Sequence, residues 1–272
     1  MTFAVTKMHG AANDFVMIGH RMAFLPADAT ALFARLCDRH RGIGADGVLV
    51  LEPSAVADFR MRYHNSDGGG ADFCGNGARC IAAFALRLGL GREGSVRFES
   101  AAGTKQAQLL ADDRIALAFG RVDMGRIVNV AAAARTFTGF HVNTGVPHFV
   151  VPVPDVADVP LMEWAPELRR HAEFGAEGAN VDFYSKCPDG RVAMRTYERG
   201  VEGETLACGS GAVATALAAL ADRLRPPIIV RTAGGDDLVV AFAETAAGPE
   251  VTLTGPAVTV YRGVWDEEAS DH

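Results

Sequence analysis

Two cysteines in this sequence stand in matching surroundings, and a cysteine side chain can act as an acid, a base or a nucleophile. Cys74 opens the run Cys74-Gly75-Asn76-Gly77-Ala78, and Cys208 opens the run Cys208-Gly209-Ser210-Gly211-Ala212. The offset between the two runs, from position 74 to position 208, recurs elsewhere in the chain. Further residues repeat at this offset, which predicts two homologous halves: Ala82 with Ala216, Ala85 with Ala219, Leu86 with Leu220, Leu90 with Leu224, Phe15-Val16 with Phe149-Val150, and Val96-Arg97 with Val230-Arg231.

Each cysteine is predicted to lie where a helix begins. A helix start leaves several backbone N–H groups without partners and carries partial positive charge. The glycines after each cysteine let an anion approach the backbone closely. The same field favours the thiolate over the thiol. Two such turns, if they face each other, would offer two sulfurs on opposite sides of one bound atom and two sets of N–H donors for one carboxylate.

That arrangement suits inversion at a carbon next to a carboxylate. One thiolate would remove the α-proton, and the other thiol would deliver a proton to the opposite face. The backbone dipoles would stabilise the charge that grows on the carboxylate during proton removal. The reverse reaction exchanges the two roles, which explains why both halves carry a cysteine.

The elements that position the cysteines follow from apolar periodicity and turn residues. Helices are predicted at 77–88 and 211–224, directly after the two cysteines, and also at 29–39, capped by Thr30, and at 165–172. The strand 258–264 is predicted to return to the first lobe, and 266–272 reads as a frayed acidic tail. The remaining strands are predicted at 3–8, 15–18, 48–51, 58–64, 96–99, 105–110 and 115–119 in the first lobe, and at 140–143, 149–153, 191–197, 228–231, 238–242 and 251–253 in the second.

The bulk composition excludes several classes of protein. A chain of 272 residues with 49% hydrophobic residues can bury a large core. The net charge of −7 argues against nucleic acid or an anionic membrane as a partner. The stretch from Met1 to Phe15 contains no sustained apolar segment, and no window approaches the roughly 18 apolar residues of a transmembrane helix. We therefore expect a soluble, cytoplasmic protein.

The cysteine and lysine content bears on cofactors. The five cysteines have no C-x-x-C spacing, so neither a disulfide framework nor a zinc site is expected. Only three lysines occur, Lys7, Lys105 and Lys186, and none stands in a context that suggests a Schiff base with pyridoxal phosphate. The sequence thus predicts an enzyme without metal or organic cofactor.

The full set of motifs resembles the diaminopimelate epimerase family over nearly the whole chain. The resemblance implies an α/β (α+β) fold of two pseudo-symmetric lobes, each a curved, mostly antiparallel sheet wrapped around a central helix. The first lobe would comprise 1–118 plus 257–272 and the second 119–256. The motifs are Lys7-Met8-His9-Gly10, Asn13-Asp14-Phe15, Asn65-Ser66-Asp67-Gly68, the two cysteine runs, Gly145 with Pro147-His148, Tyr197-Glu198-Arg199-Gly200, Gly203-Glu204-Thr205 and Thr254-Gly255-Pro256-Ala257.

The resemblance also implies a reaction and roles for individual residues. The enzyme would interconvert LL- and meso-diaminopimelate without cofactor, as a homodimer, with Cys74 and Cys208 as the two acid/bases. His148 and Glu198 would hold and poise the cysteines and the α-amino group of the substrate. The residues expected to bind substrate are Asn65, Asn180 and Arg199 at its distal end, Asn13 in the cleft, and the backbone of Gly75-Asn76 and Gly209-Ser210 at the reacting carboxylate.

Two positions depart from the commonest pattern of the family. Gly47 stands where many members have glutamine, and Val146 where many have asparagine. Both usual side chains reach substrate, so a racemase or epimerase of the same architecture acting on another amino acid is an alternative. A thiol hydrolase that uses Cys74 with His148 is a second alternative, although it leaves the second cysteine run without a purpose.

Overall fold

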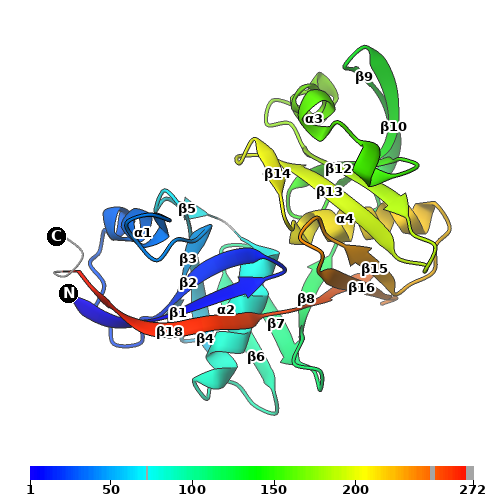
Figure 1. The fold of residues 1–272 in the computed structure, drawn as a ribbon. Helices are drawn as coiled ribbons and strands as arrows, with labels where there is room; N and C mark the ends of the chain where they lie inside the picture. Colours follow the sequence, from blue (N-terminus) through cyan, green and yellow to red (C-terminus); the bar gives the residue numbers. More distant parts are fainter. Residues whose placement is uncertain (72, 246–248, 268–272) are drawn as a thin grey trace. The chain divides into compact units, whose positions relative to one another are not determined.

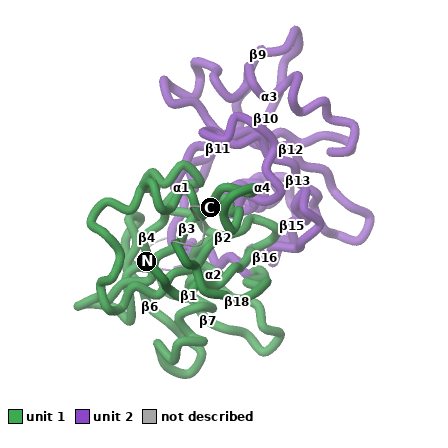
Figure 2. The backbone as a smooth tube through the Cα atoms, turned by 60° about the vertical axis from the view of Figure 1, so that its left-hand side comes forward, with its two compact units in different colours: residues 1–118, 255–272 green, residues 119–254 purple. Residues whose placement is uncertain are grey.

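The computed structural model describes residues 1–71, 73–245 and 249–267, and the chain forms two compact units (Figures 1 and 2). Unit 1 comprises Met1–Ala118 and Gly255–His272, and unit 2 comprises Phe119–Thr254. Among the described residues, no helix is long and apolar enough to cross a membrane.

Unit 1 is a curved sheet around the helix α2 (Gly75–Arg87), which contacts six of its strands, β1, β2, β3, β4, β6 and β7. Its strand pairs are antiparallel except β2–β3 and β4–β6. The second helix, α1 (Thr30–Cys37), packs on β3. The strands are β1 (Thr2–Gly10), β2 (Asn13–Gly19), β3 (Gly47–Glu52), β4 (Phe59–Asn65), β5 (Gly70–Ala71), β6 (Ser95–Ser100), β7 (Gly103–Leu109), β8 (Ile115–Arg121) and β18 (Val258–Asp266).

Unit 2 repeats this plan around α4 (Gly209–Ala221), which contacts strands β10 to β13, β15 and β16. The helix α3 (Leu161–Arg169) packs on β9, β12, β13 and β14. Two short 3₁₀ helices, Val156–Asp158 and Ala172–Phe174, flank α3. The strands are β9 (Arg126–Ala132), β10 (Arg135–Asn143), β11 (Pro147–Pro152), β12 (Asn180–Lys186), β13 (Val192–Glu198), β14 (Gly203–Thr205), β15 (Ile228–Arg231), β16 (Asp237–Ala243) and β17 (Glu250–Gly255).

The duplication read from the sequence extends to the strand register. Shifted by the offset that relates Cys74 to Cys208, the bounds of α2 coincide with those of α4, and those of β7 coincide with those of β16. In unit 1 the parallel pair β2–β3 aligns Phe15 with Gly47, and in unit 2 the pair β11–β12 aligns Phe149 with Val181. The predicted fold class, two pseudo-symmetric α/β lobes each built on a central helix, is confirmed.

The last strand completes the symmetry of unit 1. In unit 2, β10 pairs antiparallel with β9, which directly precedes it in the chain. In unit 1, the corresponding edge of β1 is instead paired antiparallel with β18, drawn in red beside β1 in Figure 1. Pairing satisfies the backbone groups of an edge that would otherwise remain open. The predicted return of 258–264 to the first lobe is therefore confirmed.

Part of each sheet, β1 to β3 in unit 1 and β11 to β13 in unit 2, is covered on both faces, which explains the long buried runs in these strands. The central helices are rich in alanine and glycine, so several strands can approach them closely. On the other face, a cluster that includes Phe33 and Leu36 of α1 covers unit 1, and a cluster that includes Ala165 and Leu168 of α3 covers unit 2. The strands between these layers are therefore fixed by packing on two sides.

Several local predictions were wrong. Thr30 is the first residue of α1, and the N-cap residue is Ala29, which makes no side-chain cap hydrogen bond. The Thr30 N–H instead donates to Asp28 Oδ1 at 3.0 Å. The helix predicted at 165–172 begins at Leu161 and accommodates Pro166 in its interior. The strand β9 was missed, because Ala133 and Ala134 look helical yet form a turn with φ of 49° and 56°. The tail predicted at 266–272 begins too early, because Asp266 is the last residue of β18 and pairs with Thr2, while 268–272 lie outside the described residues.

Candidate active site

Cys74 and Cys208 are the N-cap residues of α2 and α4. Both have extended backbone, with φ/ψ of −133°/118° and −121°/114°, and each sulfur accepts the N–H of the residue three positions later at 3.4 Å. This is the cap geometry usually provided by serine or aspartate. The helices begin directly after the cysteines, slightly earlier than predicted, so both thiols lie at the positive end of a helix.

In unit 2, a continuous chain of side chains leads from Cys208 to a buried carboxylate. The Cys208 Sγ lies 3.4 Å from Ser210 Oγ, and Ser210 Oγ lies 3.0 Å from His148 Nε2. His148 Nδ1 lies 2.6 Å from Asp182 Oδ2. Thr196 Oγ1 completes the chain by donating to Asp182 Oδ1 at 2.6 Å. His148 and Asp182 are both fully buried, which makes this polar chain strong and rigid.

The direction of each hydrogen bond in this chain follows from its carboxylate end. An ionised carboxylate only accepts, so His148 Nδ1 carries a proton, and in the neutral imidazole Nε2 is then the acceptor. Ser210 then donates its hydroxyl hydrogen to Nε2 and accepts the thiol hydrogen of Cys208. Because a hydroxyl can donate as well as accept, Ser210 can also turn its hydrogen toward a Cys208 thiolate.

Asn180 ties a second part of unit 2 to this histidine. Its Nδ2 lies 3.3 Å from His148 Nε2, and its Oδ1 accepts the backbone N–H of Arg199 at 2.7 Å. These two contacts fix which way the amide points. The guanidinium of Arg199 pairs only loosely, at 3.9 Å, with Glu177. Asn180 therefore connects the His148 ring to the end of β13, where Glu198 and Arg199 lie.

Burial raises the pKa of the Cys208 thiol well above its usual range, and the negative charges of Glu198 and Asp182 raise it further. The hydrogen bonds from Ser210 and from the Gly211 N–H lower it, but by less. The helix start is expected to favour the thiolate, whereas burial and two nearby negative charges act in the opposite direction at Cys208.

Gly211 allows α4 to approach this chain closely. A Cβ atom at Gly211 would lie 2.7 Å from Asp182 Oδ1 and 3.2 Å from Cys208 Cβ. Any larger residue would displace the carboxylate or the cysteine. Gly211 of the second cysteine run is thus required by the close packing of α4 against Asp182 and Cys208.

In unit 1, the surroundings of Cys74 include two amides and a buried arginine. The Cys74 Sγ donates to Asn13 Oδ1 at 3.4 Å, and Asn76 Nδ2 donates to the same oxygen at 3.3 Å. Arg79, which is fully buried, donates to Asn76 Oδ1 at 2.8 Å and to the carbonyl of Gly75 at 3.4 Å. The two units thus place one cysteine each in different polar surroundings.

The remaining predicted residues lie at the ends of the strands in unit 1 and unit 2. Asn65 is exposed at the end of β4, where its backbone closes a turn with Gly68 and Gly69. Gly47 faces it across β3–β4. Val146 lies in the turn before β11, where its carbonyl accepts the Thr144 N–H at 3.1 Å. The substrate-binding role of Asn65 therefore stays a prediction, and Gly47 and Val146 stay the two departures from the family pattern.

Gly47 leaves no room for the glutamine that is common in the family. A Cβ atom there would lie 2.4 Å from the carbonyl oxygen of His64 and 2.7 Å from Tyr63 Cε2. The ring of Tyr63, which contacts Phe15 edge-on at 6.1 Å, therefore covers the place where a side chain would start. In this chain, a side chain at position 47 would therefore meet both the His64 carbonyl and the Tyr63 ring.

Sequence reasoning missed three residues that the structure joins to the cysteines. Asp182 and Thr196 lie on buried strands, where a lone polar residue gives no signal of its partner. Arg79 follows the first cysteine run, but the sequence did not show that it is buried against Asn76. An acidic residue inside the apolar run Asn180-Val181-Asp182-Phe183 was the one available sign, because a buried carboxylate needs a partner.

No group of three or more histidine, cysteine, aspartate or glutamate side chains is placed to hold a metal ion within residues 1–71, 73–245 and 249–267. What the arrangement provides instead is acid/base chemistry at two sulfurs. Duplicated α/β units, each with a cysteine capping its central helix, define the class: a two-thiol protein suited to moving protons.

Comparisons with known proteins assign the family. The model of the family "Diaminopimelate epimerase" matches residues 5–130 and 140–260. A diaminopimelate epimerase of Desulforudis audaxviator is 40% identical, over 96% of this chain and 98% of its own length. One of Aquifex aeolicus is 36% identical, over 98% and 99%. The chain belongs to the diaminopimelate epimerase family.

Solved structures share the fold at much lower identity. A phenazine biosynthesis protein of the PhzF family from Bacillus anthracis has a TM-score of 0.70 at 16% identity, covering 98% of this chain and 99% of its own. A hydroxyproline epimerase from Agrobacterium vitis, solved with bound trans-4-hydroxy-L-proline, has a TM-score of 0.67 at 19% identity, over 99% and 94%. At these identities the likeness concerns the fold alone.

Proposed function

We propose that this protein interconverts LL- and meso-diaminopimelate by proton transfer at the α-carbon, with Cys74 and Cys208 as the two acid/bases. The observation that carries the proposal is the pair of cysteines, each capping the central helix of its unit, in a chain that belongs to this family. One sulfur takes the α-proton as a thiolate and the other gives a proton as a thiol.

The chain from Cys208 to Asp182 supports the proposed chemistry. When Cys208 gives up its proton, Ser210 can turn its hydroxyl toward the new thiolate, and Asn180 continues to donate to His148 Nε2. Hydrogen bonds to the charged form stabilise it, so the chain serves Cys208 in both protonation states. His148 is proposed to act through Ser210, and Glu198 is proposed to bind the α-amino group.

The substrate-binding roles remain proposals. We propose that the backbone N–H groups of Gly75-Asn76 and Gly209-Ser210 bind the reacting carboxylate, because they lie in the first turns of α2 and α4. Asn13, Asn65, Asn180 and Arg199 are proposed to contact other parts of the substrate. The reaction requires no metal or organic cofactor in this proposal.

Solvent exchange tests the function directly. The protein is incubated in heavy water with LL-diaminopimelate, and deuterium incorporation and inversion are followed by NMR and chiral chromatography. We expect deuterium only at the α-carbon that inverts. Replacing Cys74 or Cys208 with alanine should abolish inversion, and a Cys187→Ala variant serves as the control. Full activity of either active-site variant would refute the two-base mechanism.

A panel of other free amino acids tests the rival substrates. Gly47 and Val146 depart from the commonest family pattern, which is the specific reason to include them. Inversion of a different amino acid, with none of diaminopimelate, would select the alternative racemase. A thiol hydrolase built on Cys74 and His148 is disfavoured, because both ring nitrogens of His148 already contact Asp182 and Ser210.

We also propose that the protein is a homodimer formed through β18. Val258, Val260, Tyr261 and Val264 on this strand are exposed, and a row of exposed apolar side chains on an edge strand favours pairing with a second copy. Analytical ultracentrifugation should show a dimer that a Val260→Asp substitution dissociates. A wild-type monomer at micromolar concentration would refute this proposal.

A further inference from the structure

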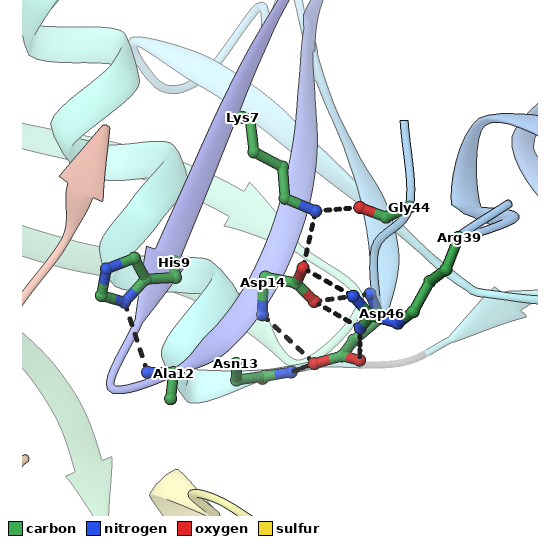
Figure 3. Close-up of polar contacts among 8 residues, drawn as sticks. All are labelled: Lys7, His9, Ala12, Asn13, Asp14, Arg39, Gly44 and Asp46. Atoms are coloured by element: carbon green, nitrogen blue, oxygen red, sulfur yellow. Dashed lines mark hydrogen bonds and ion pairs between the residues drawn. The ribbon is translucent and has the colours of Figure 1, made fainter. Parts of the chain in front are cut away.

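A second polar chain, in unit 1, ends on Cys74 and contains charged residues that the proposed mechanism does not use. It consists of Lys7, Asp14, Arg39 and Asp46, with Asn13 between Asp46 and the cysteine. Figure 3 shows these side chains pointing toward one another at the start of β2. Asn13 Nδ2 donates to Asp46 Oδ2 at 2.7 Å, while its Oδ1 faces the Cys74 thiol at 3.4 Å.

The charges around Asp46 keep it an acceptor. Arg39 Nη2 lies 2.7 Å from Asp46 Oδ1 and 2.9 Å from Asp14 Oδ1. Lys7 Nζ lies 2.6 Å from Asp14 Oδ2 and also donates to the carbonyl of Gly44. Two positive and two negative groups therefore balance. The backbone N–H of Asp14 donates to the same oxygen of Asp46 as Asn13 does, at 3.2 Å.

The orientation of the Asn13 amide is determined from both ends of this network. At one end, Arg79 can only donate, so Asn76 must turn its oxygen to Arg79 and its nitrogen to Asn13. At the other end, Asp46 only accepts, so Asn13 must turn its nitrogen to Asp46. Asn13 is thereby left with an oxygen, and not an N–H group, facing Cys74.

The duplication independently marks position 46. Asp14 and Asp46 correspond to His148 and Asn180 at the same offset that relates Cys74 to Cys208. In unit 2 these two positions hold the histidine and the asparagine that lead to Cys208 through Ser210. In unit 1, Asp46 reaches Cys74 through Asn13, whereas the Asp14 side chain pairs with Lys7 and Arg39.

We propose that Asp46 is a positioning residue for Cys74, which holds the Asn13 amide with its oxygen toward the sulfur and so stabilises the thiol form of Cys74. A carbonyl oxygen accepts the thiol hydrogen but offers a thiolate nothing, whereas the hydroxyl of Ser210 serves Cys208 in both forms. This inference deepens the proposed function. It is tested on the free thiol without substrate, so that its failure and the failure of the proposed function can be told apart.

Other titratable groups near this chain must be held constant in the test. Among the residues that the structure describes, they include Lys7 and His9 on β1, Asp14 on β2, Cys37 on α1, Arg39 after α1, Arg79 and Cys80 on α2, Lys105 on β7 and Tyr261 on β18. Burial raises the pKa of Cys37 and of Cys80 to about 12, so neither thiol competes with Cys74 below pH 10.

The experiment measures the rate of Cys74 alkylation by iodoacetamide against pH. Trypsin cleaves after Arg62 and Arg79, so Cys74 lies alone on its peptide and can be quantified by mass spectrometry after labelling of the intact full-length protein. The variants compared are Asp46→Ala and Asp46→Asn, which remove the same charge. Asparagine keeps an oxygen at the point where Asn13 and the Asp14 N–H converge, whereas alanine does not.

We expect Asp46→Ala to lower the pH midpoint of Cys74 alkylation by about one unit, because Asn13 can then turn its N–H toward the thiolate. Asp46→Asn should stay close to wild type. In an Asn13→Ala background the two variants should not differ. Equal shifts in Asp46→Ala and Asp46→Asn would show that Asp46 acts by charge alone, and no shift in either would show that it does not act on Cys74. Both results overturn the proposal.

Circular dichroism and thermal unfolding verify that each variant is folded. Asp46 is exposed, so its substitution should cost little stability, and Asp46→Leu, which also has no side-chain acceptor, replaces the alanine variant if that one does not fold. Asp112→Asn, which removes an exposed carboxylate paired with Arg114, is the control for a change of charge elsewhere. It should leave the alkylation profile unchanged.

Discussion

Replacing Asp182 by asparagine removes one negative charge from the centre of unit 2 and leaves the shape of the side chain unchanged. The carboxylate accepts hydrogen bonds from His148 Nδ1 and Thr196 Oγ1, both at 2.6 Å, and is fully buried. A bond to a charged acceptor contributes about 1.5–3 kcal/mol, against about 0.5–1.5 kcal/mol for a neutral one. The loss of charge at two bonds should therefore lower the free energy of unfolding by about 2 kcal/mol.

The effect on activity should be smaller and should follow from the orientation of the new amide. The Thr196 hydroxyl can rotate to accept the amide N–H, so the amide oxygen stays with His148 and the Nδ1–H tautomer persists. Only the charge-assisted part of the His148 contact is lost, about 1 kcal/mol, which corresponds to about a fivefold fall in kcat/KM. Asp182→Ala leaves a buried N–H without a partner and should cost about 100-fold.

Urea unfolding and the heavy-water inversion assay measure the two quantities on the same preparations. Asp222→Asn is the control, because this carboxylate is half-exposed and pairs with Lys186 at the surface; it should change stability by less than about 0.5 kcal/mol. Wild-type stability and activity in Asp182→Asn would refute the reasoning. So would an unchanged cost of Asp182→Asn in a Ser210→Ala background, since Asp182 would then not act through Ser210.

Three further predictions concern single positions. Gly47→Gln should lower the melting temperature and displace β3 from β4, because its Cβ would lie 2.4 Å from a backbone carbonyl. The control Gly70→Ala, whose Cβ would have no atom beyond its chain neighbours within 4 Å, should leave the melting temperature unchanged. An unchanged melting temperature in Gly47→Gln would contradict the packing argument. Burial alone would raise the pKa of Asp14, but hydrogen bonds from Arg39 and Lys7 hold that pKa at about 2. Since this pKa lies below the value in the unfolded chain, ionised Asp14 stabilises the fold above about pH 5, and about 2 kcal/mol of this stabilisation is lost as the pH falls to 2. The difference in unfolding free energy between wild type and Asp14→Asn should therefore shrink over that range. Cys208 should be alkylated more slowly than a free thiol at pH 8. Glu198→Gln should speed this alkylation by lowering the pKa of Cys208, and an unchanged rate would argue that Glu198 does not act on the Cys208 thiol.

The order of the elements and the two cysteines could be predicted from the sequence because both depend on local pattern. A Cys-Gly-x-Gly-Ala run that leads into an alanine-rich stretch predicts a helix start wherever it occurs, and its repetition at Cys208 predicts the second lobe. Alternation of apolar residues located most strands. Where local preference and tertiary context disagree, prediction failed: Ala133 and Ala134 favour a helix in isolation but form the turn between β9 and β10.

The sequence by itself determined that this chain is duplicated, that each half has one cysteine at a helix start, and that two thiols are available for proton transfer. Only the tertiary structure decided which residues are linked to those thiols by hydrogen bonds. Asp182 reaches Cys208 through His148 and Ser210, and Asp46 reaches Cys74 through Asn13, by contacts between residues distant in the chain. The physical reason is that a hydrogen bond depends on the distance and direction between its donor and acceptor atoms in space. The spacing of residues along the sequence does not determine either of them. The same holds for the pKa of Cys208, because the burial that raises this pKa exists only once the unit has folded.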